Sequence, residues 1–500
     1  VMGWSSWNTY RVNINDSLIY SQAKAVVEHG LDTVGYRYIN IDDGFFGGRS
    51  IDGGELKFHP ARFPQGLTTL VKKIHSLGLK AGIYSDAGLN TCGNFWDNDT
   101  IAENVGLYGH EVSDCKLLFD SIGFDRIKID FCGGDSAQNN QRLSLSPKSR
   151  YSQIRNVMDS LGHKDVKLGV CRWCYPGTWV ENIASDWRIS GDINCSWESV
   201  KHIIYENMYL SGFSSYGHYN DMDMLEIGRG LSREEERSHF GMWCMMNSPL
   251  LIGCDLETIP DESLALLKNK NLIAINQDSL AEQAYPIKCI GGGYVLARDL
   301  SEANGRKRAV ALYNPTDCPL EMSVSAAELC YASNIAVYDL FTDSVLGEMD
   351  EICTIVEPHN TYIYLTIGDE RTHRSMYEAE SAYLHEYQEI NNPLDAGTPF
   401  LMFDKGCSGG VATANLHAIT FRNVNIVKRG VYKLRFKIAQ PMPSALTLIC
   451  NGKSQIMSQK ISDSWTMAEM TLLLEAGNNF VSLTSDGVMN VDFMLIEPIE

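Results

Sequence analysis

Residues 126–132 read RIKIDFC and have the form of a buried strand that ends in a carboxylate. Ile127 and Ile129 alternate with Lys128 and Asp130, and a β-strand sends alternate side chains to opposite faces. The lysine and the aspartate therefore share one face. A carboxylate at such a strand end destabilises the fold unless a cation or hydrogen bonds compensate it. This stretch thus indicates a site as well as a core element.

Similar apolar stretches, separated by helical ones, lie on both sides of RIKID. The spacing of apolar residues predicts helices such as 17–31 and 66–79. Repeated β-then-α units predict a (β/α)8 TIM barrel over residues 1–281, with a doubly wound sheet as the alternative. In a barrel of this kind, reactive residues lie at the C-terminal ends of the strands. The other predicted strands are 37–42, 80–86, 167–172, 186–190 and 250–253.

The pattern becomes all-β after residue 282, where alternating stretches are divided by Gly, Asn, Asp and Pro. This texture predicts an antiparallel β-sandwich over residues 282–369. The charged segment 369–375 is typical of a linker, and residues 376–500 are predicted to form a second, jelly-roll-like β-sandwich. The expected fold class is therefore α/β plus all-β. The predicted strands are 292–300, 307–315, 334–341, 361–368, 430–439 and 478–486.

Composition and charge narrow the function. The formal net charge of −20 at pH 7 argues against a nucleic-acid partner, because a phosphate backbone attracts basic surfaces. No apolar run reaches the ~18 residues that a membrane-spanning helix needs. The sequence starts at Val1 without an initiator Met, so we expect that a signal segment was removed from a secreted, periplasmic or otherwise exported protein. Nothing in the sequence indicates the oligomeric state.

Aspartates collect at the predicted strand ends. Any one of them alone is more simply explained as a turn residue or a helix N-cap. The set as a whole indicates a functional site, with Lys128 and Arg188 as counter-ions for some of the carboxylates. The aspartates are Asp42, Asp43, Asp86, Asp130, Asp192, Asp221 and Asp223.

Sugar hydrolysis suits this set of residues. No His cluster or Ca²⁺-loop spacing accompanies the acids, and the sequence has no GxSxG elbow, P-loop or Rossmann fingerprint. Glycoside hydrolysis needs one carboxylate to attack or assist and another to deliver a proton. It also needs an indole to lie against the sugar, and Trp4, Trp7, Trp173 and Trp187 flank predicted strand ends.

Ten ordered blocks between residue 2 and about residue 365 resemble family 27 of the glycoside hydrolases, the α-galactosidases and α-N-acetylgalactosaminidases of clan D. The resemblance implies an exo-acting, retaining α-galactosidase that releases terminal α-linked galactose from oligo- or polysaccharides by double displacement, with no cofactor for catalysis. The blocks include MGWSSWN (2–8), YINIDDGF (38–45), GLKAGIYSDAG (78–88), KIDFC (128–132), WRISGDI (187–193) and YNDMDML (219–225).

The resemblance also assigns a role to each matching residue. Asp130 would be the nucleophile, and Asp192 the general acid and then the general base. Asp192 is expected to be protonated near neutral pH, while Lys128 favours the ionised form of Asp130. Cys92 and Cys132 would form a disulfide beside the pocket, which implies an oxidising compartment. Substrate binding would fall to Trp7, Asp42, Asp43, Tyr84, Lys128, Arg172, Trp173, Arg188 and Asp223.

The stretch CRWC at residues 171–174 departs from the family pattern. Arg172 stands where α-galactosidases usually have Glu, and its size disfavours a pocket for an N-acetyl group. Arg172 is expected to bind the sugar 2-hydroxyl, because a guanidinium donates several hydrogen bonds. The alternatives are that it points to solvent and pairs with an acid, or that it recognises a charged or 2-substituted glycan. Cys171 lacks its usual partner, since Ala184 stands there, so it is free or paired with Cys174 or Cys195.

Three other functions stay open from the sequence. An α-N-acetylgalactosaminidase and a β-L-arabinopyranosidase belong to the same family, although the intact pair of Asp42 and Asp43 favours galactose. A non-catalytic glycan-binding protein is the alternative of another class. A missing nucleophile or acid would indicate that class, and both residues are present.

The C-terminal region resembles a carbohydrate-binding module of the family 6/35 type. The resemblance lies in MYEAESA (376–382), the stretch 421–439 and VDFMLIEP (491–498). It implies that Glu378, Glu380 and Asp492 hold a structural Ca²⁺, since acidic oxygen ligands suit this ion. A metal-free sandwich is the alternative.

Overall fold

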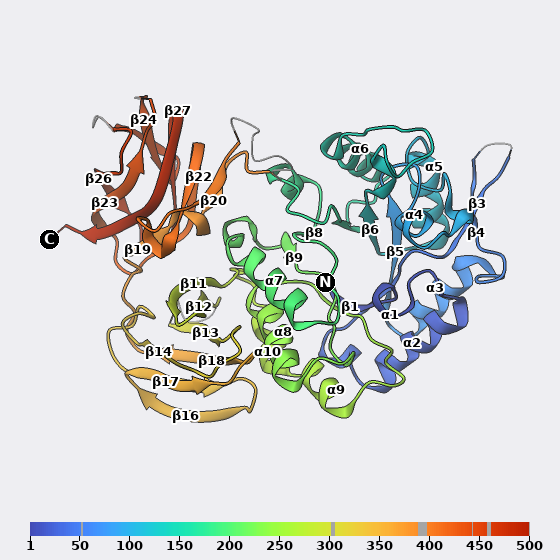
Figure 1. The fold of residues 1–500 in the computed structure, drawn as a ribbon, viewed down its shortest axis with the longest axis horizontal. Helices are drawn as coiled ribbons and strands as arrows, with labels where there is room; N and C mark the ends of the chain where they lie inside the picture. The colour runs from blue at the N-terminus through green and yellow to red at the C-terminus, as the bar shows by residue number, and fades with distance from the viewer. Residues whose placement is uncertain (52–53, 302–305, 389–397, 443, 458–461, 500) are drawn as a thin grey trace. The chain divides into compact units, whose positions relative to one another are not determined.

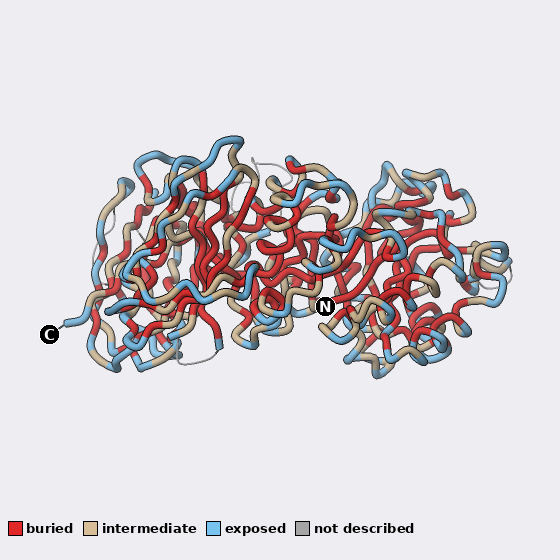
Figure 2. The backbone as a smooth tube through the Cα atoms, turned by 90° about the horizontal axis from the view of Figure 1, so that it is seen from below, coloured by how far each residue is buried: buried red, intermediate tan, exposed pale blue. Residues whose placement is uncertain are grey.

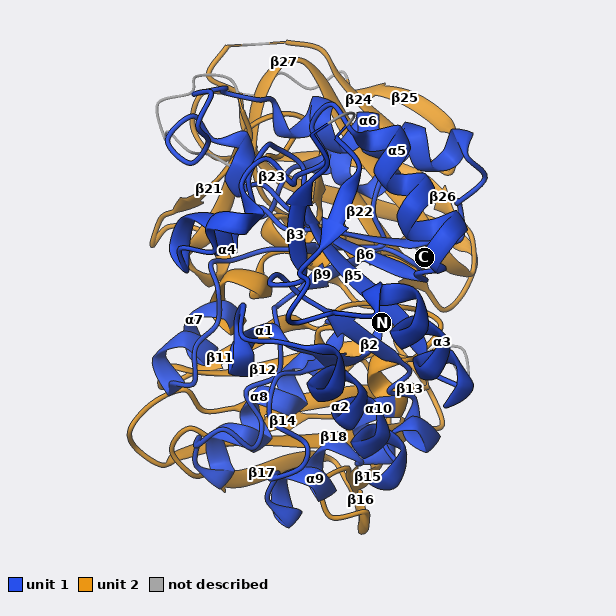
Figure 3. Cartoon of the chain, turned by 90° about the vertical axis from the view of Figure 1, so that its right-hand side faces the viewer, with its two compact units in different colours: residues 1–203, 217–243, 248–273 blue, residues 204–216, 244–247, 274–500 orange. Residues whose placement is uncertain are grey.

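The structure, a computed structural model, describes residues 1–51, 54–301, 306–388, 398–442, 444–457 and 462–499 (Figure 1). The chain divides into two compact units. One contains residues 1–203, 217–243 and 248–273, and the other contains residues 204–216, 244–247 and 274–500 (Figure 3). The domain bounds 1–281, 282–369 and 376–500 stay a prediction.

Eight parallel strands form the centre of the first unit, in the order β10-β1-β2-β5-β6-β7-β8-β9. The two ends of this sheet meet through a parallel bridge between Leu225 and Ile252, where the N–H of Leu225 donates to the carbonyl of Leu251 at 2.7 Å. The predicted fold class is confirmed, and the alternative of a doubly wound sheet is wrong. The strands are β1 (Met2–Ser5), β2 (Tyr38–Ile41), β5 (Lys80–Asp86), β6 (Arg126–Asp130), β7 (Lys167–Val170), β8 (Asp186–Arg188), β9 (Tyr219–Asp221) and β10 (Leu250–Ile252).

The helices of the barrel follow local sequence signals. The predicted helix 66–79 is α3, which buries Leu67, Leu70, Val71 and Ile74 on one face. It ends before Gly78, whose positive φ of 77° suits a residue without a Cβ. The helices are α1 (Trp7–Tyr10), α2 (Asp16–Glu28), α3 (Gly66–Ser76), α4 (Cys92–Trp96), α5 (Glu111–Cys115), α6 (Pro147–Ser160), α7 (Trp197–Met208), α8 (Arg233–Met245), α9 (Asp261–Leu267) and α10 (Lys270–Asn276), with a π-helix at Lys116–Ile122 and a hairpin of β3 (Phe46–Arg49) and β4 (Leu56–Phe58).

The second unit begins with an antiparallel sandwich. A six-stranded sheet, β11-β12-β13-β18-β15-β16, and the pair β14-β17 enclose a buried core that includes Val310, Leu312, Val324 and Val337. Figure 2 colours the backbone by burial; the central strands β12 and β13 are buried along most of their length, whereas the edge strand β16 has no buried residue. The strands are β11 (Tyr285–Ile290), β12 (Gly293–Asp299), β13 (Lys307–Tyr313), β14 (Leu320–Ser325), β15 (Ile335–Asp339), β16 (Ser344–Met349), β17 (Glu351–Val356) and β18 (Thr361–Gly368).

The chain after residue 375 is also antiparallel, as predicted, and its described residues form a sheet of nine strands. The long strands β22 and β27 pair with each other and organise the others. None of the helices in the described part of the chain combines the length and apolar character needed to cross a membrane. The strands are β19 (Met376–Glu378), β20 (Tyr383–Leu384), β21 (Phe400–Phe403), β22 (Val411–Ile426), β23 (Gly430–Ala439), β24 (Leu446–Cys450), β25 (Lys453–Met457), β26 (Thr466–Leu474) and β27 (Gly477–Pro498).

Candidate active site

A cavity of about 290 Å³ is formed by residues at the C-terminal ends of the barrel strands. This is the place that the barrel prediction gave for reactive residues. Its volume is close to the lower end of the roughly 300–1,000 Å³ that small-molecule sites occupy. The sequence-predicted residues that line it are Trp7, Asp42, Tyr84, Cys92, Lys128, Asp130, Trp173, Arg188, Asp192, Asp221 and Asp223.

Strand β6 brings Lys128 and Asp130 into the cavity together. Their neighbours Ile127 and Ile129 are fully buried in the core, as the alternation predicts. The Lys128 Nζ atom lies 3.5 Å from Asp130 Oδ1 and 3.3 Å from Asp42 Oδ2. It also lies 5.4 Å from the ring centroid of Tyr84, which pairs with Lys128 in the register of β5 and β6. The ammonium group of Lys128 is therefore the counter-ion of both Asp130 and Asp42.

The pKa of Asp130 is raised to about 6. Burial is the largest cause. Lys128 lowers this pKa, as predicted, but burial outweighs it, and the charges of Asp42 and Asp192 raise the pKa further. A hydrogen bond from Cys171 also lowers it. Lys128 alone therefore does not keep this carboxyl at its ordinary acidity.

Cys171 is a buried thiol whose pKa is raised well above its ordinary value, first by burial and then by Asp130. It stays protonated at neutral pH and can donate to a carboxylate. Among the described residues, Cys171 forms no disulfide with Cys174 or Cys195, so the two pairings left open from the sequence are wrong.

Arg188, at the end of β8, joins two further carboxylates. Its Nη2 atom lies 3.0 Å from Asp192 Oδ1 and 2.9 Å from Asp223 Oδ2. The N–H of Ile193 also donates to Asp223 Oδ2, at 2.9 Å. Asp223 has a positive φ of 76°, a conformation that Asp tolerates better than most residues. These contacts fix Asp223 and Arg188 and leave the Asp192 side chain 60% exposed.

The pKa of Asp192 is lowered. Partial burial raises it, but the charges of Arg188 and Lys128 and hydrogen bonds from Arg188 and Trp173 outweigh this effect. The structure therefore reverses the predicted order of acidity, in which Asp192 was protonated and Asp130 ionised. The reason is that Arg188 holds Asp192 as a carboxylate, whereas Asp130 is the more deeply buried group.

Asp43 and Arg172 are not among the residues that line the cavity. Asp43 is fully buried and accepts the N–H groups of Gly44 at 2.8 Å and Gly93 at 2.7 Å, so it holds the loop that carries α4. Burial raises its pKa to about 7, despite the hydrogen bonds that lower it. The Arg172 guanidinium lies over the ring of Phe131, 4.7 Å from its centroid. The predicted hydroxyl contacts of these two residues stay predictions.

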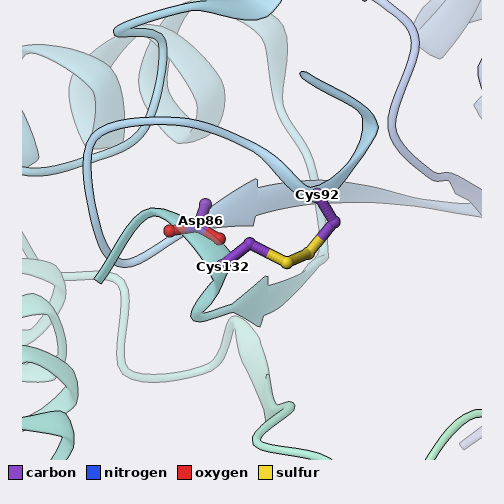
Figure 4. A group of neighbouring side chains, drawn as sticks. All are labelled: Asp86, Cys92 and Cys132. Atoms are coloured by element: carbon purple, nitrogen blue, oxygen red, sulfur yellow. A yellow bond between two sulfur atoms is a disulfide. The ribbon is translucent and has the colours of Figure 1, made fainter. Parts of the chain in front are cut away.

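Cys92 and Cys132 form the disulfide that the family resemblance implied. Asp86 lies beside it, and the three side chains are close enough to resemble a metal centre (Figure 4). The two sulfurs are bonded to each other, however, and a metal site of this kind needs thiolates. Asp86 instead accepts the N–H groups of Gly88 at 2.6 Å and Gly133 at 3.1 Å. The group therefore ties together the loops that follow β5 and β6.

Several residues of the cavity wall were not predicted from the sequence, and two of the four candidate indoles lie outside the cavity. Arg11 and Trp96 line the cavity. The only sequence signal for them is their position, since Arg11 follows the block MGWSSWN and Trp96 follows Cys92. Trp4 and Trp187 are fully buried and do not line it. Trp187 donates to Asn220 Oδ1 at 2.8 Å, which is a structural contact. Arg126 also belongs to the wall and was not predicted, whereas Asp221 belongs to it and is one of the predicted strand-end aspartates.

Several carboxylates at the strand ends of a closed barrel, with indoles beside them, define a glycosidase site. Residues 1–278 match the sequence model of the family described as alpha galactosidase A. The chain belongs to this family and is an α-galactosidase, a glycoside hydrolase that releases α-linked galactose.

A relative and a solved structure agree with this assignment, and a more distant structure shares the fold alone. The chain is 36% identical to alpha-galactosidase 2 of Arabidopsis thaliana over 369 residues, which cover 73% of this chain and 88% of that protein. The crystal structure of alpha-galactosidase I from Mortierella vinacea has a TM-score of 0.65 at 30% identity, over 74% of this chain and 97% of that one. An isomalto-dextranase from Arthrobacter globiformis T6 shares the fold over 99% of this chain and 96% of its own, with a TM-score of 0.64 at 15% identity.

Proposed function

We propose that the enzyme cleaves terminal α-galactosides with retention, with Asp130 as nucleophile and Asp192 as acid and then base. The observation that carries this proposal is that both carboxylates line one cavity and interact, since the charge of Asp192 raises the pKa of Asp130. Retaining glycosidases place two carboxyl groups about 5–5.5 Å apart for this chemistry.

The proposed reaction has two displacements. Asp130 attacks the anomeric carbon while Asp192 gives a proton to the leaving oxygen, and a glycosyl ester forms on Asp130. Asp192, now ionised, then takes a proton from water, which displaces Asp130 and releases galactose in its original configuration. These steps use only side chains and water. The first displacement requires one proton on the pair of aspartates, carried by Asp192, and the second requires Asp192 to be ionised.

Asp42, Lys128 and Trp7 are proposed to hold the galactose. Asp42 and Lys128 already form an ion pair in the cavity, so both can bond to neighbouring hydroxyls of one sugar. Asp42 is itself fixed, because its N–H donates to Ser6 Oγ at 3.0 Å. Trp7 lines the cavity with Arg11 over its ring, 4.7 Å from the centroid. An ion pair and an aromatic face together suit a neutral, polyhydroxylated ring.

Activity on p-nitrophenyl α-galactoside tests the proposed mechanism. NMR of the first product should show α-galactose, the retained anomer, and Asp130→Ala should abolish turnover. First formation of β-galactose would contradict double displacement. Faster cleavage of the N-acetylgalactosaminide or of the β-L-arabinopyranoside would favour one of the two related specificities.

We also propose that Glu378, Glu380 and Asp492 hold a structural Ca²⁺. The Oε2 atoms of Glu378 and Glu380 are buried with no hydrogen-bond partner among the described residues. Burial and the charge of Glu378 raise the pKa of Glu380 to about 9. The cluster therefore holds more carboxyl groups than nearby positive charges can balance. Lys437 offsets only part of the negative charge, with its Nζ atom 2.8 Å from Asp492 Oδ2. A divalent cation suits this set of oxygen ligands.

We further propose that the enzyme acts in an oxidising compartment outside the cytosol. The disulfide between Cys92 and Cys132 supports this proposal, because such bonds are rare where thiols are kept reduced. Recovery of the native protein from the exported fraction, with this disulfide intact by mass spectrometry of its peptides, would support the proposal. Recovery of the reduced protein from the cytosol alone would contradict it.

A further inference from the structure

Two aromatic side chains stand exposed on α4, at the edge of the cavity. Trp96 lines the cavity and is 62% exposed, and Phe95 is 41% exposed. Their rings form an edge-to-face pair, with centroids 4.8 Å apart and planes at 89°. Scattered exposed apolar residues are ordinary, but an exposed aromatic pair at the mouth of a binding cavity is typical of a ligand-binding surface.

The backbone that carries Trp96 is held at several points. Cys92 is bonded to Cys132, and the N–H of Gly93 donates to the buried carboxylate of Asp43. The side chain of Thr91 caps the helix by accepting the N–H of Asn94 at 3.2 Å. A platform fixed in this way loses little conformational entropy when a ligand lies against it.

A second anchor follows directly after Trp96. Asp97 accepts two hydrogen bonds from Arg11, at 2.7 and 2.8 Å. The guanidinium is thereby neutralised, so this part of the mouth offers an apolar ring and a compensated ion pair. Such a surface suits an uncharged sugar better than an anionic one.

Exposure sets the direction in which the substrate extends. Asp130, the proposed nucleophile, is only 5% exposed, whereas the side chain of Asp192, the proposed acid, is 60% exposed. The galactose ring must therefore occupy the closed end, and the leaving group must lie toward the open end. The hydrogen bond to Asp97, the residue next to Trp96, is the largest cause that raises the pKa of Arg11. The charge of Asp192 raises this pKa further, so Arg11 and Asp192 interact electrostatically.

We propose that Trp96, supported by Phe95, is the platform on which the leaving sugar stacks. This inference rests on the proposed function and deepens it by assigning a subsite for an uncharged hexose next to the galactose. The indole presents a flat apolar face, which matches the C–H face of a pyranose. Because the contact exists before and during bond cleavage, it contributes mainly to substrate binding and hence to KM.

Two substrates separate this subsite from the catalytic centre. Raffinose has a leaving sugar, whereas α-galactosyl fluoride has none. For Trp96→Ala we expect kcat/KM on raffinose to fall about tenfold, equal to about 1.4 kcal/mol, mainly through a higher KM. The same variant should keep kcat/KM on α-galactosyl fluoride within about twofold of wild type. Trp96→Phe retains a ring and should lose less on raffinose.

Controls make each outcome decisive. Tyr216 is 73% exposed and does not line the cavity, so Tyr216→Ala should leave both rates unchanged. Equal losses on both substrates, or no loss on either, in a Trp96→Ala variant that unfolds at the wild-type temperature would overturn the platform. If Trp96→Ala does not fold, full activity of Trp96→Gln on raffinose would overturn it equally. A wild-type enzyme that cleaves neither substrate would contradict the proposed function, and the platform with it.

Discussion

Arg188 Nη2 lies 3.0 Å from Asp192 Oδ1, and this contact holds the proposed acid as a carboxylate. The pKa of Asp192 is therefore lowered while burial raises that of Asp130 to about 6. Between the two pKa values the pair carries one proton, mostly on Asp130. The reactive form has that proton on Asp192, so it is the minor arrangement of the same total charge. The pH profile then reports the pair and not either residue alone.

Raffinose and α-galactosyl fluoride should consequently show opposite responses to pH. Cleavage of raffinose needs one proton on the pair, so kcat/KM should fall as the pH rises through about 6. Fluoride leaves without protonation and needs only ionised Asp130, so kcat/KM should rise through the same pH. Initial rates at low substrate concentration between pH 4 and pH 8 would measure both. Parallel profiles would show that the pair does not share a proton in this way.

The thiol of Cys171 should tune the nucleophile. Its hydrogen bond lowers the pKa of Asp130, so Cys171→Ala should move the rise of kcat/KM on α-galactosyl fluoride to higher pH. Cys171→Ser keeps a donor and should move it less. A pure loss of rate without a shift in pH would indicate that Cys171 serves packing alone. Cys195, which is exposed and does not line the cavity, provides the control Cys195→Ser.

Local sequence signals were sufficient for the barrel strands β2, β5, β6, β7, β8 and β10 and for the aspartates at their ends, whereas the short strands β1 and β9 were not predicted. The alternation in RIKID predicts both the buried face of β6 and the shared face of Lys128 and Asp130, because it depends on strand geometry alone. The order of acidity could not be predicted, since it depends on how deeply Asp130 is buried and on where Arg188 lies in space. Trp96 could not be predicted as a site residue, because one exposed aromatic residue in a short helix produces no periodic pattern in the sequence.

The adjacent residues Asp42 and Asp43 look equivalent in the sequence but should respond differently to substitution. Asp43→Ala removes the acceptor of the N–H groups of Gly44 and Gly93, and each buried unsatisfied group costs about 1–3 kcal/mol. The free energy of unfolding, measured with urea, should fall by at least that amount. Asp42→Ala should reduce kcat/KM more strongly than it reduces stability, since its carboxylate lines the cavity beside Lys128. If Asp43→Ala reduced mainly kcat/KM and Asp42→Ala reduced mainly stability, the structural role would belong to Asp42 and the binding role to Asp43.

Ca²⁺ should stabilise the protein more strongly as the pH rises. The raised pKa of Glu380, about 9, means that the folded protein without metal keeps a proton that the unfolded chain releases near pH 4.3. This contribution to stability is full below about pH 4.3 and is lost as the pH rises through about 9. Ca²⁺ binds the ionised form, so at pH 7 its binding should release a proton and raise the unfolding temperature.

Calorimetry in two buffers of different ionisation enthalpy would count the released protons, and thermal unfolding with Ca²⁺ or EDTA would measure the stabilisation. Glu380→Gln should remove both effects, because an amide cannot ionise and is a weaker Ca²⁺ ligand. Asp404→Asn, an exposed acid on the same unit, is the matched control. Equal unfolding temperatures with Ca²⁺ and EDTA at pH 7 and at pH 8.5 would show that the cluster is a protonated structural group and not a metal site.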